Sequence, residues 1–131
     1  MSYLLDTNIW IAYLKGKDAP LRDRMTGMGV EEILLCSPVK AELLYGARRS
    51  ERVQENLARL APFFARFPSC PFDDRAAEQY GLVRALLEQQ GQPIGGVDLL
   101  ISGIALAADA TVVTRNDREF RRVPGLRVEV W

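Results

Sequence analysis

Four acidic residues in this chain share one feature, which is that each lies where an expected strand passes into a helix or a turn. They are Asp6, Glu42, Asp98 and Asp117. Asp6 directly follows the apolar run 3–5, and Asp117 follows the apolar run 111–114. Ligands of open α/β sheets bind outside the carboxyl ends of the strands, where such junctions lie. The spacing therefore predicts a carboxylate cluster at one edge of a sheet.

The absence of histidine limits the chemistry that such a cluster can perform. With no His in the chain, His metal sites, Ser-His-Asp triads and His general acid–base catalysis are excluded. Gathered carboxylates repel one another, so a cluster is useful when a cation fills it. Oxygen-only donors suit Mg²⁺ or Mn²⁺, which in proteins commonly activates a water and neutralises the charge that develops on a phosphate. The residues alone thus predict metal-dependent phosphate chemistry.

Each acid also has a purely structural interpretation. Asp6 and Asp98 would each suit a helix N-cap, which stabilises a protein by about 1 kcal/mol. Asp117 would suit a turn. Glu42 would suit a solvated helix face, although apolar residues surround it in the sequence. The four acids together are more specific than any one of them.

The basic residues fit phosphate binding but do not require it. The formal net charge is zero, which argues weakly against a nucleic-acid partner. All but three of the 17 cations are Arg, whose guanidinium binds two phosphate oxygens at once. Many of them gather in two clusters, which are Arg48, Arg49 and Arg52, and Arg115, Arg118, Arg121 and Arg122. From charge alone, solvated helix faces paired with nearby Glu residues are the simpler explanation.

Length and composition predict one globular domain that spans residues 1–131. The hydrophobic fraction is 48% and the charged fraction 26%, as in ordinary folded domains. No apolar run approaches the roughly 20 residues that cross a bilayer, and residues 1–6 lack the pattern of a signal peptide. We therefore expect a cytoplasmic protein without a membrane partner. Cys36 and Cys70 are interpreted as buried thiols, with a disulfide or metal pair as the alternative.

Alternating apolar segments predict an α/β fold with a mainly parallel sheet of about five strands. The expected strands cover 3–5, 33–36, 69–72, 111–114 and 126–130. The expected helices cover 8–14, a segment from Ser37 past Gly46, 48–67 with a candidate break at Pro62, 74–90, 98–108 and 119–123. Ser37 is the predicted N-cap of the second helix, with Pro38 in its first helical position.

Four sequence blocks occur in order along the chain: LDTN at 5–8, KAELLYGA at 40–47, PIGGVDLLI at 93–101, and TRNDREF at 114–120 followed by VPGL. With these blocks the chain resembles the PIN-domain ribonucleases, and most closely the VapC-type toxins of bacterial toxin–antitoxin pairs. The resemblance covers essentially the whole length. It implies a PIN-like three-layer α/β/α fold.

The resemblance also implies a role for particular residues. The acidic positions of the family correspond to Asp6, Glu42, Asp98 and Asp117, which would be catalytic and hold the metal. The fourth position varies in the family, so Glu119 is the reserve candidate. Asn8 and Thr114 match polar positions that support the site. Candidates to position the RNA backbone are Arg48, Arg49, Arg115 and Arg118.

The activity implied is Mg²⁺- or Mn²⁺-dependent endonucleolytic cleavage of RNA, with tRNA as the expected target, leaving 5′-phosphate and 3′-hydroxyl ends. The resemblance further implies a homodimer, and a VapB-type antitoxin whose C-terminal segment lies across the toxin. Two other functions stay open: a non-enzymatic PIN-like module that binds RNA or protein, and a housekeeping RNA-processing nuclease. A dinucleotide-binding domain is excluded, because no Gly-rich turn follows the first strand.

Overall fold

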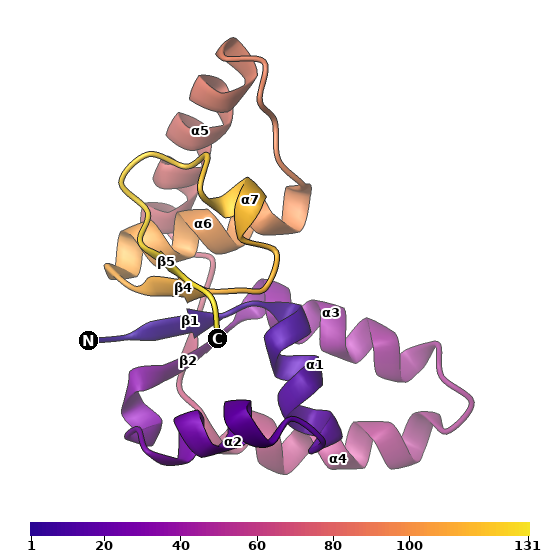
Figure 1. The fold of residues 1–131 in the computed structure, drawn as a ribbon. Helices are drawn as coiled ribbons and strands as arrows, with labels where there is room; N and C mark the ends of the chain where they lie inside the picture. The colour runs from indigo at the N-terminus through magenta and orange to yellow at the C-terminus, as the bar shows by residue number, and fades with distance from the viewer.

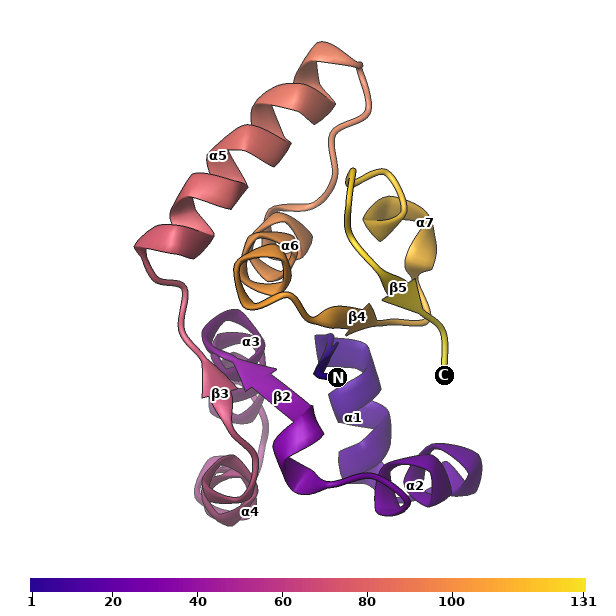
Figure 2. The ribbon, with the colours of Figure 1, turned by 90° about the vertical axis from the view of Figure 1, so that its left-hand side faces the viewer.

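The computed structural model describes residues 1–131 and contains five parallel strands with helices on both sides of the sheet (Figures 1 and 2). The strand order is β3-β2-β1-β4-β5, so that β1 is central. The strands are β1 (Tyr3–Leu5), β2 (Ile33–Cys36), β3 (Ser69–Cys70), β4 (Thr111–Val113) and β5 (Val128–Glu129). In β1, Leu4 is in register with Leu34 on one side and Val112 on the other. The predicted α/β class with a mainly parallel sheet is confirmed.

Seven helices and one 3-10 turn connect the strands. They are α1 (Thr7–Lys15), α2 (Ala19–Thr26), the turn Val30–Glu32, α3 (Ser37–Arg48), α4 (Val53–Arg66), α5 (Asp74–Gln89), α6 (Gly96–Ala108) and α7 (Asp117–Phe120). Helices α5, α6 and α7 lie on one side of the sheet, and α1, α2 and α4 lie on the other (Figure 1). Helices α3 and α4 form a hairpin that extends away from the sheet (Figure 1). No helix is long and apolar enough to cross a membrane.

An aromatic cluster fixes α1 against α4. Trp10 is fully buried, and its ring centroid lies 5.0 Å from that of Phe63 and 4.9 Å from that of Phe67. Buried aromatic side chains supply large apolar area, and tilted or edge-to-face rings are their favoured arrangement. Because α1 begins directly after Asp6, this packing also fixes the direction that the backbone takes at Asp6, between β1 and α1.

Close packing of α5 on α6 fixes the second helix that carries an acid. A Cβ atom added to Gly103 of α6 would lie 2.8 Å from the carbonyl oxygen of Ala76 in α5. Only glycine permits that approach, since real Cβ contacts are never so short. Leu99 and Ile101 are buried on the same helix. The start of α6, with Asp98 in its first turn, is therefore held in one place.

Several predicted boundaries differ from those observed. Helix α2 was not expected, although Asp18 caps it and Pro20 lies in its first turn. Ser37 is not the N-cap of α3: Cys36 takes that position with extended backbone angles and without a side-chain capping bond. Pro62 does not break α4, since Pro62 and the residue one turn before it are exposed, so that water can bond the freed carbonyl.

Other boundaries move by a few residues. Helix α6 begins at Gly96 rather than at Asp98, and α7 begins at Asp117 rather than at Glu119. The predicted third strand lies at the edge of the sheet, which agrees with its proline. Both cysteines are free thiols; Cys36 is buried, whereas Cys70 is only half-buried.

Candidate active site

Asp6 lies at the carboxyl end of the central strand and is only 6% exposed. Its backbone N–H donates to the carbonyl of Val113 in β4 at 3.0 Å. Its side-chain Oδ1 accepts the N–H of Ile9 at 3.1 Å and so caps α1. Burial raises the pKa of Asp6, and the hydroxyl of Thr114, the N–H of Ile9 and the charge of Arg115 oppose this rise. Asp6 is both the helix cap and a buried acid in the candidate site.

Thr114 supports Asp6 from the neighbouring strand end. It is fully buried, and its hydroxyl lies close enough to the carboxyl of Asp6 to lower the pKa of that carboxyl. The Thr114 hydroxyl oxygen also accepts the N–H of Asn116 at 2.9 Å. A hydroxyl can donate one bond and accept others, so Thr114 links the carboxyl ends of β1 and β4.

Asp98 lies in the first turn of α6, after the N-cap Gly95, which has no side chain to cap the helix. The pKa of Asp98 is raised to about 6, mainly by burial and in addition by the negative charges of Glu119 and Asp6 and by a hydrogen bond with Glu119. Three acids from different parts of the chain therefore interact here: Asp6, Asp98 and Glu119. A strongly perturbed carboxyl beside other acids is typical of functional sites.

The two candidates for the fourth acid are placed differently. Glu119 Oε1 accepts the N–H of Gly95 at 2.8 Å, which ties α7 to the start of α6. The carboxylate of Asp117 instead pairs with the guanidinium of Arg121 at 2.5 Å, and this bond lowers the pKa of Asp117. Asp117 is not among the charges that raise the pKa of Asp98. Of the two positions that the sequence left open, the geometry favours Glu119.

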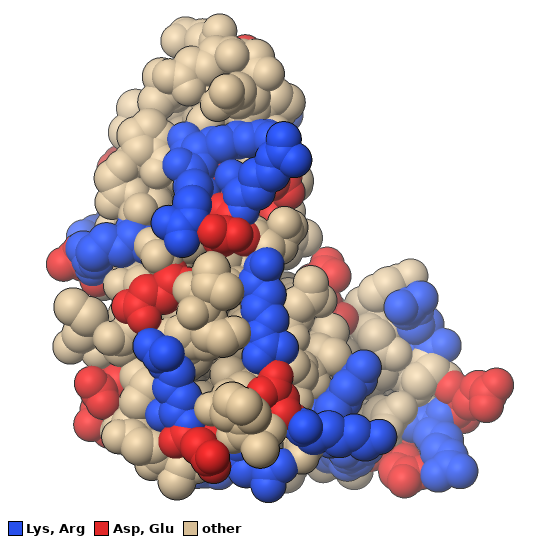
Figure 3. Space-filling model, viewed as in Figure 1, with Lys and Arg blue, Asp and Glu red and all other residues tan.

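The remaining predicted residues surround this centre. Asn8 and Glu42 have exposed side chains, on α1 and α3; the backbone N–H of Asn8 contributes to lowering the pKa of Asp6. Arg115 lies close enough to Asp6 for its charge to lower that pKa. Arg48, Arg49 and Arg118 are exposed. Figure 3 shows that Lys and Arg side chains alternate with Asp and Glu on one face, rather than forming one basic field.

The donor set fits a hydrated divalent cation. No three acidic side chains converge as ready metal ligands in this structure, but Asp6 and Asp98 interact as like charges and both have a raised pKa. A cation between them would relieve that repulsion. Mg²⁺ commonly binds through only one or two carboxylates and keeps several waters. Asp6 and Asp98 would hold such an ion, with Glu119 beside Asp98.

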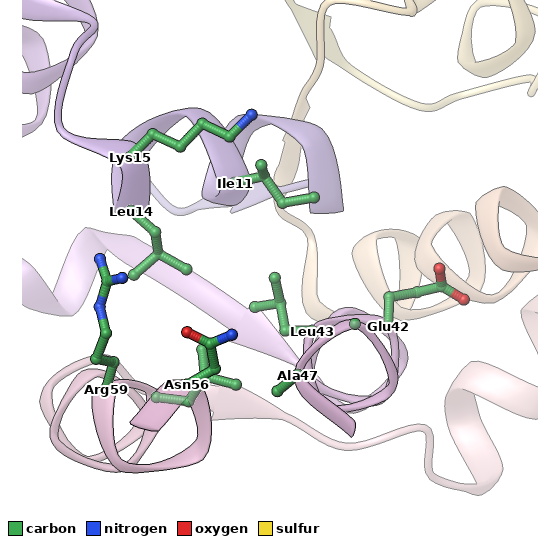
Figure 4. A pocket seen from close by; sticks show the side chains of 10 residues that line it. Ile11, Leu14, Lys15, Glu42, Leu43, Ala47, Asn56 and Arg59 are labelled. Carbon is green, nitrogen blue, oxygen red and sulfur yellow. The ribbon is translucent and has the colours of Figure 1, made fainter. Parts of the chain in front are cut away.

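A pocket of about 390 Å³ lies among α1, α3 and α4. Its apolar lining includes Ile11, Leu14 and Leu43, and Lys15 and Arg59 contribute charge. Figure 4 shows the carboxylate of Glu42 pointing away from the other labelled side chains. Glu42, one of the predicted acids, is itself among the residues that line the pocket, whereas none of the three interacting carboxyls lies there.

The fold and the site define a class: an α/β protein with a carboxylate site at the carboxyl edge of a parallel sheet, suited to divalent metal and phosphate. Comparison with known proteins gives the family. The sequence model of the PIN-domain family matches residues 3–126 of this chain. The tRNA(fMet)-specific endonuclease VapC of Shigella flexneri is 39% identical over 131 residues, covering 100% of this chain and 98% of the relative. Ribonuclease VapC2 of Rickettsia felis is 39% identical over 132 residues, with the same coverage.

Solved structures agree with this relationship. The DNA-bound VapBC of Salmonella typhimurium contains a chain with TM-score 0.93 and 37% identity, covering 100% of this chain and 98% of that one. VapBC2 of Rickettsia felis, bound to a DNA fragment from its promoter, gives TM-score 0.92 and 35% identity, covering 100% and 99%. The chain belongs to the PIN-domain family, in its VapC group of ribonucleases. It is accordingly a nuclease, and nucleases of this group generally depend on a divalent metal.

The site contains one residue that the sequence analysis did not consider. Asp18 accepts a hydrogen bond from Arg115 at 2.6 Å, which connects the start of α2 to the strand end beside Asp6. The signal for it was present, because an Asp two residues before a Pro is a typical helix start. Its pairing with Arg115, far along the chain, is a tertiary feature that no local pattern contains.

Proposed function

We propose that this chain is a Mg²⁺- or Mn²⁺-dependent endoribonuclease that acts as a single domain and as the toxin of a type II toxin–antitoxin pair. The observation that carries the proposal is the interaction of Asp6, Asp98 and Glu119 at the carboxyl edge of the sheet. Full-length similarity to named VapC ribonucleases supports it. The oxygen-only donors favour Mg²⁺ or Mn²⁺ over softer metals.

Each part of the site has a role in phosphodiester hydrolysis. Asp6 and Asp98 would hold the divalent ion, and Glu119 would position Asp98 by fixing the start of α6 through the N–H of Gly95. When bound, the ion supplies Lewis-acid stabilisation of an in-line displacement at phosphorus. Glu42 is exposed on α3, and Asp117 lies on α7. Both would add negative charge around the two residues that hold the ion. Attack by water on phosphorus would break the bond to the 3′ oxygen, which leaves and takes up a proton, so that the products carry a 5′-phosphate and a 3′-hydroxyl.

Initiator tRNA is the substrate that the comparisons favour. Two relatives, from Shigella flexneri and Salmonella typhimurium, are named tRNA(fMet)-specific endonucleases and are 39% and 37% identical to this chain. We propose the same substrate here, and therefore action in the cytoplasm. Exposed Arg48, Arg49, Arg115 and Arg118 would bind phosphates of the RNA backbone.

We also propose a VapB-type antitoxin as partner, and a homodimer as the working form. The Salmonella typhimurium and Rickettsia felis neighbours are VapBC complexes. The pocket among α1, α3 and α4 has apolar walls and the cations Lys15 and Arg59, which suits an amphipathic segment with acidic residues. A housekeeping nuclease is the alternative to the toxin role, whereas the similarity to named ribonucleases speaks against a non-enzymatic PIN-like module.

The decisive experiment is cleavage of purified initiator tRNA by antitoxin-free protein. We expect cleavage with Mg²⁺ or Mn²⁺, none in EDTA, and fragments with 5′-phosphate ends at one position. Elongator tRNAs treated in parallel test the substrate preference. A folded protein that cuts no RNA with either metal would favour the non-enzymatic module. Efficient cleavage of many unrelated RNAs, with no antitoxin frame beside the gene, would favour the housekeeping nuclease.

A further inference from the structure

Arg115 lies at the edge of the acidic site and is held there from two directions. It follows Thr114, whose backbone N–H donates to the carbonyl of Glu129 at 3.0 Å, so its backbone is fixed at the carboxyl end of β4. Its Nη2 donates to Oδ2 of Asp18 at 2.6 Å, and its Nε donates to the main-chain carbonyl of Trp131 at 2.9 Å. The Arg115 side chain remains 43% exposed.

Asp18 uses its two carboxylate oxygens for two different tasks. Oδ1 accepts the N–H of Leu21 at 3.1 Å and caps α2, while Oδ2 binds Arg115. One side chain thereby links the start of α2 to the end of β4. Partly exposed ion pairs contribute little to the stability of a fold. Stability alone is therefore a weak explanation for the pairing of Asp18 with Arg115.

The second partner of Arg115 is itself anchored. The indole ring of Trp131 lies under the guanidinium of Arg24 at 4.7 Å and 5.4 Å from the ring of Tyr3. The indole N–H donates to Glu129 at 3.1 Å, and Glu129 pairs with Arg24 at 3.2 Å. These contacts fix the carbonyl that Arg115 binds.

These bonds leave part of the guanidinium available for a ligand. A guanidinium has five N–H donors in a rigid fork; one edge, Nε and Nη2, faces Trp131 and Asp18, and Nη1 has no protein acceptor. An Arg held in place binds a phosphate better than a mobile one, because less side-chain freedom is lost on binding. Close to Asp6, a fixed positive charge would also offset the repulsion of an RNA backbone by the acids.

We propose that Asp18 is a positioning residue that, with the carbonyl of Trp131, holds Arg115 beside the acids so that Arg115 binds a backbone phosphate of the RNA. The inference rests on the proposed ribonuclease function. It goes beyond the general expectation for the arginines, because it singles out one of them and names the two groups that orient it.

The test uses Asp18→Asn, because Asn keeps the capping oxygen for α2 and removes only the charge that binds Arg115. The matched control is Asp109→Asn, which removes the Asp109–Arg127 pair of 3.0 Å at the opposite end of β4. Asp109 has a left-handed φ of 52°, which Asn tolerates well. Arg115→Gln and the double variant Asp18→Asn/Arg115→Gln complete the set.

The first readout is binding of fluorescent initiator tRNA in EDTA over a range of salt concentrations. Arg115→Gln should reduce the slope of log affinity against log salt by about 0.7–0.9, the loss of one phosphate contact. The second readout is cleavage with Mg²⁺, in which Asp18→Asn should raise KM about 3–10-fold with a smaller change in kcat. Asp109→Asn should match the wild type in both.

The double variant separates positioning from independent effects. If Asp18 acts through Arg115, the double variant should be no worse than Arg115→Gln alone. Multiplying effects, or an Asp18→Asn variant that binds and cleaves like the wild type, would overturn the inference while leaving the ribonuclease function intact. A wild-type protein that neither binds nor cuts tRNA would overturn the proposed function, and the inference with it.

Discussion

Glu119 lies against Asp98 at the first turn of α6, and their carboxyls share a hydrogen bond. Glu119 comes from α7 and also accepts the N–H of Gly95, the cap of α6. A hydrogen bond between two carboxyls needs a proton on one of them, and Asp98, with a pKa of about 6, is the group whose pKa is raised. At neutral pH the ionised pair therefore carries a repulsion that a cation would relieve.

The metal-free protein should be stabilised at neutral pH by Asp98→Asn. The folded-state pKa of Asp98, about 6, lies above its ordinary value of 3.8, so its favourable contribution is complete below about pH 4 and is lost as the pH rises to about 6. Asn removes the charge, and at pH 7.5 in EDTA we expect a Tm about 3–6 °C above the wild type. Thermal unfolding at several pH values measures this.

Two controls accompany that measurement. At pH 3.5 the difference in Tm between Asp98→Asn and the wild type should nearly vanish, because Asp98 is then largely protonated in both the folded and the unfolded wild type. Mg²⁺ at pH 7.5 should raise the Tm of the wild type and not that of the variant. A lower Tm for Asp98→Asn in EDTA at pH 7.5 would contradict the assignment of a strained acidic pair.

Glu119→Gln and Asp117→Asn should have unequal effects on cleavage. Glu119 is bonded to Asp98 and Gly95, whereas Asp117 is paired with Arg121. Gln keeps an oxygen for the N–H of Gly95 and removes only the negative charge beside Asp98. Changes next to a metal ligand typically alter affinity or activity about 10–100-fold, and we expect a loss of that size for Glu119→Gln. Asp117→Asn should stay within about 3-fold. Mg²⁺ titrations of tRNA cleavage compare the two, and the reverse order would make position 117 the fourth acid.

The acids that sequence reasoning placed best are those fixed by regular elements. Asp6 directly follows a buried strand, and Asp98 precedes a run of apolar residues that forms a buried helix. The rule that parallel strands present their carboxyl ends to one site accounts for the position of Asp6. It does not account for Asp98, because α6 follows α5 with no strand between them, so the proximity of Asp98 to Asp6 results from the packing of α6. The step to RNA came from the family resemblance.

Whether Asp117 or Glu119 is the fourth acid of the site depends on the residue at which the short helix α7 begins. The i,i+4 pair of Asp117 and Arg121 is a local pattern that sequence can indicate once α7 is known to begin at Asp117. The bond of Glu119 to Gly95 joins residues 24 positions apart. That bond, like the pairing of Asp18 with Arg115, results from the packing of whole elements and has no local signature.

Asp6→Asn should abolish metal-dependent cleavage and leave the fold intact. The Asn side-chain oxygen can still accept the N–H of Ile9 and cap α1, while the negative charge for the cation is lost. We expect activity at least 100-fold below the wild type, with unchanged circular dichroism and a Tm that is equal or higher, because a buried charge has been removed. Substantial Mg²⁺-dependent cleavage by the folded variant would exclude Asp6 as a ligand.

Gly103→Ala should destabilise the protein, because the added Cβ would lie 2.8 Å from the backbone carbonyl of Ala76. Overpacking of this kind lowers the free energy of unfolding by about 1–3 kcal/mol. It should also move α6, which carries Asp98 in its first turn, away from α5. Gly81→Ala, in α5, is the matched control: nothing lies within 4 Å of its Cβ position, so better helix propensity should stabilise it by up to about 1 kcal/mol. Urea unfolding compares the two, and equal free energies of unfolding would show that α5 and α6 are not in close contact at Gly103.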